Sequence, residues 1–337
     1  MTHQDQTSET ADRIKTADQP GADHSADLTA RIALVAGATR GAGRAIAREL
    51  GRAGATVYVT GRSTAGAPSD YGRPETIEET AELITAEGGT AHAVVVDHLE
   101  MDQVKALVAR IEAEQGRLDI LINDIGGEAY VELEDIPLWQ HDHDAGRRLL
   151  DAGLLTHLNT THAALGLMVR HPGALVVEVT DGTREYNRTH YREALYLDLT
   201  KTAVDRLAFA QGHELVPHQG TAVSVSPGWL RSEMMLDHFG VTEENWRAAA
   251  EADSGVKDAV PPHEFVVSET PAMLARGIAA LAADPERFTW NTCSTSSYEL
   301  AQHYGLTDVD GSRPNAWSYI TALETTPSAE LDVDQYR

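Results

Sequence analysis

The chain has 337 residues, which is enough for one large α/β domain or two small ones and for a sizeable core. Acidic side chains outnumber basic ones by 52 to 27, and the formal net charge of −25 argues against a nucleic-acid duplex or an anionic membrane as a partner. The single cysteine, Cys293, excludes an intrachain disulfide and is typical of a reducing compartment, so we expect a cytoplasmic protein. No apolar run approaches the roughly 20 residues of a membrane-spanning helix.

The sequence predicts a single folded domain with an extension at each end. Residues 1–29 are polar and lack both a periodic apolar face and the apolar core of a signal peptide, so we expect a disordered N-terminal extension. Residues 30–305 are predicted to form the domain, and residues 306–337 an irregular C-terminal tail.

Six apolar runs alternate with amphipathic segments along the domain. The runs are nearly continuous in Val, Ile, Leu and Ala, which is typical of parallel strands covered on both faces. The segments between them place apolar residues at helical spacing, as in "DQVKALVARIEAEQG". This alternation predicts an α/β fold with a Rossmann-type, doubly wound parallel sheet. The predicted strands are 31–37, 56–61, 92–97, 118–124, 174–179 and 221–227.

The loop "VAGATRGAGRAIA" leads from the first predicted strand into a helix. Gly37, Gly41 and Gly43, with Thr39 between them, allow a tight turn and a close approach of the backbone to a ligand. The positive end of the following helix then favours a pyrophosphate. The sequence therefore predicts a dinucleotide site here.

Arginines, not an acid, flank the position that would contact the adenosine ribose. An NAD site usually has a carboxylate after the second strand, but this strand ends in "VTGRS", with Arg62, and Arg40 lies in the glycine loop. Because guanidinium groups bind phosphate in a forked geometry, the pair favours NADP over NAD. Asp97, after the third strand, either accepts a hydrogen bond from the adenine amino group or caps the next helix.

Two segments interrupt the alternation. Residues 63–80 begin as a Gly/Pro/Ser loop after the second strand, and residues 232–268 form a long insertion after the sixth. Both follow strand ends, where open α/β sheets bind ligands. The insertion is therefore either a substrate loop or a plain surface excursion.

Further segments follow the fourth, fifth and sixth predicted strands in a recognisable order. They read "NDIGG" (123–127), "VEVTDGT" (177–183) and "SPGWLRSEM" (226–234). Together with the glycine loop and Asp97, they make the chain resemble a short-chain dehydrogenase/reductase over about residues 30–290. Within that family it is similar to a bacterial branch related to the dehydrogenase/reductase member 1 group.

The resemblance implies a cofactor and a reaction. Asn123, Pro227 and Gly228 would lie on the cofactor side, the last two at the nicotinamide, and Ser232 would contact a cofactor phosphate or amide. The expected reaction is hydride transfer between NADP(H), with NAD as the alternative, and a carbonyl or secondary alcohol of a small organic molecule.

The resemblance also implies a catalytic lysine with a supporting asparagine. Lys201 is the only lysine in "LDLTKTAVDRLAFAQGHEL" and would hold the nicotinamide ribose. Asn159, on the preceding helix, would support the lysine through water. Both roles come from the family pattern.

The catalytic tyrosine of the family departs from its usual spacing here. Tyr196 lies five residues before Lys201, and Leu197 holds the usual position four residues before it. On a regular helix, positions four apart differ by about 40° and positions five apart by about 140°. Tyr196 would therefore have to precede the first regular turn, or a π-bulge would have to realign it. Otherwise the acid is another residue or is absent.

Other side chains could take the missing roles. Tyr186 or Tyr191, with His190 beside them, border the expected pocket. The family's serine is also absent, and Thr180 or Asp181 takes its place, although an ionised Asp181 could not donate a hydrogen bond.

Two rival functions remain. One is a lyase or isomerase that uses Asp181 or His190 for proton transfer, and the other is a nucleotide-binding protein without turnover. "HDHD" (141–144) lacks metal-site spacing, so we expect a solvated loop and no metal. Family members often pair through the helices that follow strands four and five, so we also expect a homo-oligomer.

Overall fold

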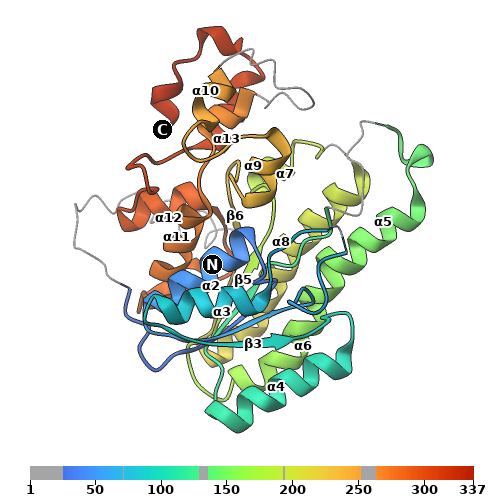
Figure 1. Cartoon of the computed structure of the whole chain (residues 1–337), viewed down its shortest axis with the longest axis vertical. Helices are drawn as coiled ribbons and strands as arrows, with labels where there is room; N and C mark the ends of the chain where they lie inside the picture. Colours follow the sequence, from blue (N-terminus) through green and yellow to red (C-terminus); the bar gives the residue numbers. More distant parts are fainter. Residues whose placement is uncertain (1–25, 71, 129–135, 193, 252–262) are drawn as a thin grey trace, which may run out of the picture.

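The computed structural model describes residues 26–70, 72–128, 136–192, 194–251 and 263–337. Its centre is one parallel sheet in the order β3-β2-β1-β4-β5-β6-β7, with helices on both faces (Figure 1). The predicted doubly wound α/β fold is confirmed. The strands are β1 (Ile32–Ala36), β2 (Thr56–Gly61), β3 (Thr90–Val95), β4 (Ile120–Asn123), β5 (Leu175–Val179), β6 (Thr221–Ser226) and β7 (Ser294–Ser296).

Two layers of helices bury the faces of the sheet. One layer consists of α2 (Gly41–Arg52), α3 (Ile77–Ala86), α11 (Pro271–Ala283) and α12 (Ser297–Tyr304), and its core includes Ile46 and Leu274. The other consists of α4 (Met101–Gln115), α6 (Thr156–Met168) and α8 (Leu195–Leu215), with Leu107 and Leu167 in its core. Both faces are covered, so β1, β4, β5 and β6 are buried along their whole length. In the described part of the chain, no helix is long and apolar enough to cross a membrane.

The order in which successive strands are added to the sheet reverses between β1 and β4. The chain proceeds from β1 outward through β2 and β3, and from β4 outward on the other side. The loops that follow β1 and β4 therefore separate at the carboxyl edge and leave a crevice, which is the usual ligand position in such sheets.

Two elements between β4 and β5 shape this crevice. Helix α5 (His143–Leu150) continues through a π-helical turn (Asp151–Leu155) directly into α6. The wider turn thus lies in the helix before β5, whereas α8 is an uninterrupted α-helix. The π-bulge proposed between residues 196 and 201 is therefore not present.

The insertion and the C-terminal tail pack together above the carboxyl edge (Figure 1). The insertion contains α9 (Glu233–Phe239), α10 (Trp246–Glu251) and a short 3-10 turn (His263–Val267), and residues 252–262 lie outside the described chain. The tail contains α13 (Ala316–Leu323), whose Tyr319 packs on Val267.

Two expectations on the ends of the chain change or stay open, and one strand was not predicted. The tail was expected to be irregular, and α13 corrects this for part of it. Strand β7 was not predicted because its three residues, Ser-Thr-Ser, carry no apolar signal. The N-terminal extension lies outside the described residues up to position 25, while Leu28 is buried in the core.

Candidate active site

A cavity of about 1350 Å³ lies at the carboxyl edge of the sheet. Single-ligand pockets usually measure about 300–1,000 Å³, so this one has room for a dinucleotide and a second small molecule. Most predicted site residues line it, namely Gly37, Thr39, Arg40, Gly41, Arg62, Asp97, Thr180, Asp181, Lys201, Pro227, Gly228 and Ser232. Gly43, Asn123, Asn159 and Tyr196 are not among its lining residues.

The glycine loop has the shape that a pyrophosphate requires. Gly37 and Gly41 adopt positive φ angles of +92° and +55°, which side chains disfavour. A Cβ atom at Gly43 would lie 2.3 Å from the carbonyl oxygen of Gly37, so the third glycine lets α2 pack against the loop from behind. The loop therefore fits the phosphate cradle predicted from the sequence.

Two carboxylates lie at this N-terminus of α2. The backbone N–H of Gly41 donates a hydrogen bond to Oε2 of Glu233, on α9, over 2.9 Å. The carboxyl of Asp124, after β4, accepts from the backbone of Gly43. Burial raises the pKa of Asp124 to about 7, against the opposing effect of Lys201. The position expected to bind the pyrophosphate therefore already has two acidic side chains beside it.

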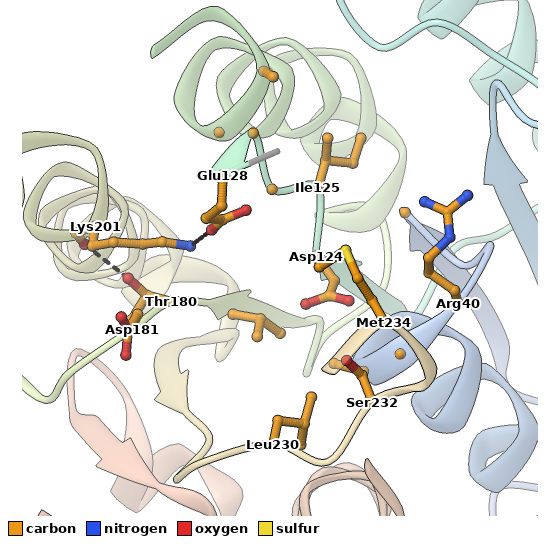
Figure 2. Close-up of a pocket in the computed structure, with 18 of the residues that line it drawn as sticks. Arg40, Asp124, Ile125, Glu128, Thr180, Asp181, Lys201, Leu230, Ser232 and Met234 are labelled. Carbon is orange, nitrogen blue, oxygen red and sulfur yellow. Dashed lines mark hydrogen bonds and ion pairs between the residues drawn. The ribbon is translucent and has the colours of Figure 1, made fainter. Parts of the chain in front are cut away.

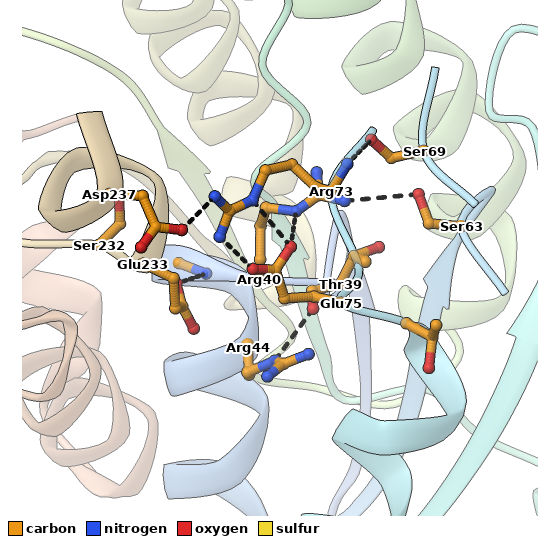
Figure 3. A network of polar contacts seen from close by, with 12 residues as sticks. Thr39, Arg40, Arg44, Ser63, Ser69, Arg73, Glu75, Ser232, Glu233 and Asp237 are labelled. Atoms are coloured by element: carbon orange, nitrogen blue, oxygen red, sulfur yellow. Dashed lines mark hydrogen bonds and ion pairs between the residues drawn. The ribbon is translucent and has the colours of Figure 1, made fainter. Parts of the chain in front are cut away.

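A network of charged side chains lies beside the glycine loop, at the end of the cavity that Arg40 lines (Figure 3). Nε of Arg40 and Nε of Arg73 each donate to Oε2 of Glu75 over 3.1 Å, and Arg73 also contacts Asp237 on α9. Burial alone would raise the pKa of Glu75, but the hydrogen bonds from Arg73 and Arg40 outweigh it and hold that pKa below its ordinary value. This network joins the glycine loop, the segment before α3 and the insertion.

Arg62 and Asp97 lie at the same end. Arg62 pairs with Asp70 over 3.0 Å and approaches Asp97 at 3.8 Å. Oδ1 of Asp97 accepts from the backbone N–H of Leu99 over 2.9 Å, so Asp97 stabilises its own turn while it lines the cavity.

The two asparagines expected at the site lie elsewhere. Asn123 is fully buried beneath the strand ends, and its Nδ2 donates to Oε1 of Glu178 over 3.0 Å. Asn159 donates to the backbone carbonyl of His98 over 3.1 Å. Asp151, at the start of the π-helical turn, lines the cavity instead. The face of this helix that borders the cavity is therefore not the face that carries Asn159.

The structure also separates Tyr196 from the cavity. Its hydroxyl lies 2.8 Å from Nδ1 of His143, and its ring packs on Gly146, both residues of α5. Leu197 lines the cavity on the face of α8 that carries Lys201. A regular helix requires this, because residues five apart point about 140° away from each other.

The Lys201 side chain points at a carboxylate that the sequence did not suggest. Its Nζ contacts Oε1 of Glu128, which follows β4, and only 14% of the lysine side chain is exposed (Figure 2). Burial favours the neutral amine, but Glu128 and the neighbouring Asp181 outweigh it and raise the pKa of Lys201. Thr180 donates its hydroxyl proton to the Lys201 carbonyl oxygen over 2.8 Å, so this hydroxyl already has an acceptor.

The cavity wall beside Thr180 combines an ion pair with aromatic rings. Asp181 pairs with Arg192, whose guanidinium lies 5.1 Å from the ring centroid of Trp317 and 5.7 Å from that of Tyr186. Burial raises the pKa of Tyr186. His190 stacks on Tyr186 and bonds Glu324, but it is not a lining residue.

Comparison with known proteins gives this geometry a family. The family model described as short chain dehydrogenase matches residues 31–239. The chain is 32% identical to the mouse (Mus musculus) protein "Dehydrogenase/reductase SDR family member 1" over 291 residues, which cover 85% of each chain. It belongs to the short-chain dehydrogenase/reductase family.

Other relatives agree with this. The human (Homo sapiens) protein of the same name is 30% identical over 293 residues, again covering 85% of each chain. A variant actinorhodin polyketide ketoreductase, solved with NADPH, superimposes with a TM-score of 0.60 at 21% identity, covering 79% of this chain and 95% of that one. The resemblance stated from the sequence is thereby confirmed, and the last comparison supports the fold alone.

This short-chain dehydrogenase/reductase has several cavity residues that sequence reasoning missed. Glu128 and Asp124 line the cavity within "NDIGGE" but carry no spacing signal. Glu75 and Arg73 follow an irregular loop and lie behind the lining residue Arg40, which contacts Glu75. Trp317 comes from the tail, where its Nε1 donates to the Pro227 carbonyl oxygen over 3.0 Å. Only the folded chain brings these segments to one edge of the sheet.

Proposed function

We propose that the protein is an NADP(H)-dependent oxidoreductase that interconverts a carbonyl and a secondary alcohol on a small organic molecule. The observation that carries the proposal is the single cavity that runs from the glycine loop to the Lys201 ammonium. It joins a cradle shaped for phosphates to the largely buried ammonium of Lys201.

The protein's own groups have separable tasks in this proposal. The N–H groups at the start of α2 hold the pyrophosphate, and Lys201 holds the nicotinamide ribose. The backbone at Pro227 and Gly228 borders the nicotinamide, and Trp317 fixes that loop through the Pro227 carbonyl. When bound, the cofactor supplies or accepts the hydride.

The preference for NADP rests on the charges that follow β2. Arg40 and Arg62 border the cavity there, and the second strand is not followed by the carboxylate that would bind a ribose diol. A 2′-phosphate would compete with Glu75 for Arg40 and with Asp70 for Arg62. A doubly charged phosphate offers these guanidinium groups more oxygen acceptors than one carboxylate does.

The substrate region is apolar and aromatic. Trp229, Met234, Phe239 and Trp317 line it, together with Leu197. Such a wall favours a substrate with a ring or an alkyl chain, because burial of apolar surface contributes about 25 cal/mol per Å².

One observation favours a second candidate, a nucleotide-binding protein without turnover. Leu197, which cannot donate a proton, lies on the Lys201 face of α8. The lyase or isomerase alternative has less support, because Asp181 forms an ion pair with Arg192 and His190 does not line the cavity.

The test is a pair of measurements on the full chain. NADPH and NADH affinities are compared by fluorescence, and NADPH oxidation is then followed with a panel of small ketones and aldehydes. We expect tighter binding of NADPH and oxidation with at least one carbonyl compound. Binding without oxidation by any of them would favour the second candidate.

A matched set of variants addresses the cofactor preference. Arg40→Ala and Arg62→Ala should weaken NADPH binding by roughly tenfold each, a loss of about 1.4 kcal/mol, and leave NADH binding nearly unchanged. Arg110→Ala, on the exposed side of α4, serves as the control for loss of one positive charge. Equal losses for both nucleotides would contradict the preference.

A further inference from the structure

We infer that the Lys201 ammonium, positioned by Glu128, is the proton-exchanging group of the active site and replaces the absent tyrosine. The inference rests on the proposed oxidoreductase function and names the acid for it. Two geometric observations and one electrostatic observation support it.

The first observation is the position of the ammonium. Nζ of Lys201 extends from α8 into the cavity and meets Oε1 of Glu128 from the loop after β4 (Figure 2). Four residues earlier on the same helical face, Leu197 contributes only carbon atoms. Of the α8 residues that line the cavity, Leu197, Lys201 and Val204, Lys201 is therefore the one whose side chain has protons to donate.

The second observation concerns the neighbouring hydroxyls. Thr180 donates to the backbone carbonyl of Lys201, and Tyr196 faces His143 on the far side of the helix. Neither hydroxyl is directed at the space in front of Nζ.

The third observation concerns charge. Three carboxylates act on the charge of the ammonium: Glu128 and Asp124, both after β4, and Asp181, after β5. Asp181 is neutralised by Arg192, and burial keeps part of Asp124 protonated because its pKa is raised to about 7. Glu128 is thus the carboxylate that balances Lys201, and it keeps the amine charged within reach of the substrate space.

In the reducing direction, one Nζ–H bond of Lys201 breaks while an O–H bond forms on the substrate oxygen, whose carbon receives the hydride of the reduced nicotinamide cofactor. Lys201 is left as a neutral amine and takes a proton from water. Glu128 stays ionised throughout and acts as a positioning residue.

The decisive measurement is the titration of Lys201 itself. The chain carries only four lysines, Lys15, Lys105, Lys201 and Lys257, so competitive acetic anhydride labelling with peptide mass spectrometry resolves each of them. We expect Glu128→Gln to lower the Lys201 labelling pKa by on the order of one unit, and Glu128→Asp to lower it less. Exposed Lys105 is the internal control and should not change.

Turnover supplies the second readout. We follow single-turnover oxidation of NADPH by the best carbonyl compound of the panel as a function of pH. In Glu128→Gln, the pH above which the rate falls should shift in the same direction as the Lys201 pKa. An unmoved Lys201 pKa overturns the inference while NADPH binding and turnover still support the proposed function. A shifted Lys201 pKa with an unmoved rate profile, or loss of turnover in Tyr196→Phe, also overturns it. Failure of every carbonyl compound overturns both.

Discussion

The carboxylate of Glu233 lies 2.9 Å from the backbone nitrogen of Gly41, and so an acidic side chain of the insertion occupies the positive end of α2. Anions are stabilised at a helix N-terminus, typically by about 0.3–1 kcal/mol and up to about 2 kcal/mol. A cofactor pyrophosphate requires the same position. Cofactor binding must therefore displace Glu233 or share its donors.

The first prediction follows from this competition. Glu233→Gln removes the negative charge and keeps a side chain of the same size, so NADPH should bind roughly three- to tenfold more tightly. Fluorescence titration at low ionic strength measures the change. Glu214→Gln, an exposed site on α8, loses the same charge and should leave the affinity unchanged. Weaker binding in Glu233→Gln would mean that the carboxylate assists the cofactor.

The second prediction concerns Asp124 and pH. Its pKa of about 7 means that the group beside Gly43 is mostly neutral at pH 6 and mostly ionised at pH 8. An ionised carboxylate repels a pyrophosphate, so NADPH binding should weaken by roughly three- to tenfold over that range. Asp124→Asn should flatten the profile and match the low-pH affinity of the native chain. A profile that keeps its slope in this variant would assign the titration to another group.

The third prediction restores the family pattern. Leu197→Tyr places a phenol four residues before Lys201, on the cavity face of α8. General acid catalysis contributes about 10²–10⁴-fold, so even an imperfectly aligned hydroxyl should raise single-turnover NADPH oxidation by roughly tenfold or more. Leu197→Phe adds the same bulk without the hydroxyl and is the matched control, since overpacking costs about 1–3 kcal/mol in either variant. Equal rates in the two variants would show that a phenol at this position does not reach the substrate.

The sequence predicted the parts of this protein that depend on local patterns. The apolar runs gave six of the strands because strands buried on both faces need no polar alternation, as β5 illustrates with five buried residues. The glycine loop was predictable because its conformation demands small residues in a fixed order, as the φ of Gly37 shows.

The placement of individual side chains in the cavity depends on how the elements pack, and the sequence predicted it less well. Asn159 was chosen by its distance from β5, but the π-helical turn before α6 changes which residues face the cavity. Tyr196 was considered because it is near Lys201 in sequence, although helical geometry already opposed it. Glu128 pairs with Lys201 across 73 positions, and sequence spacing carries no signal for such a contact.

The last prediction concerns stability and the fully buried Glu269, which precedes α11. Its Oε2 accepts from Oγ of Ser297, its Oε1 has no hydrogen-bond partner in the described chain, and burial raises its pKa to about 8. A carboxyl whose pKa is higher in the folded than in the unfolded state stabilises the fold at low pH. That contribution is lost as pH rises from the ordinary value near 4.5 through the folded value near 8.

Glu269→Gln keeps an acceptor for Ser297 and cannot ionise. At about 1.4 kcal/mol per unit of pKa difference, the variant should be more stable than the native chain at pH 9 by a few kcal/mol, a rise of several degrees in melting temperature, and nearly equal to it at pH 5. Thermal melts at the two pH values measure this, and a constant difference between the two proteins would show that Glu269 does not titrate in the folded state.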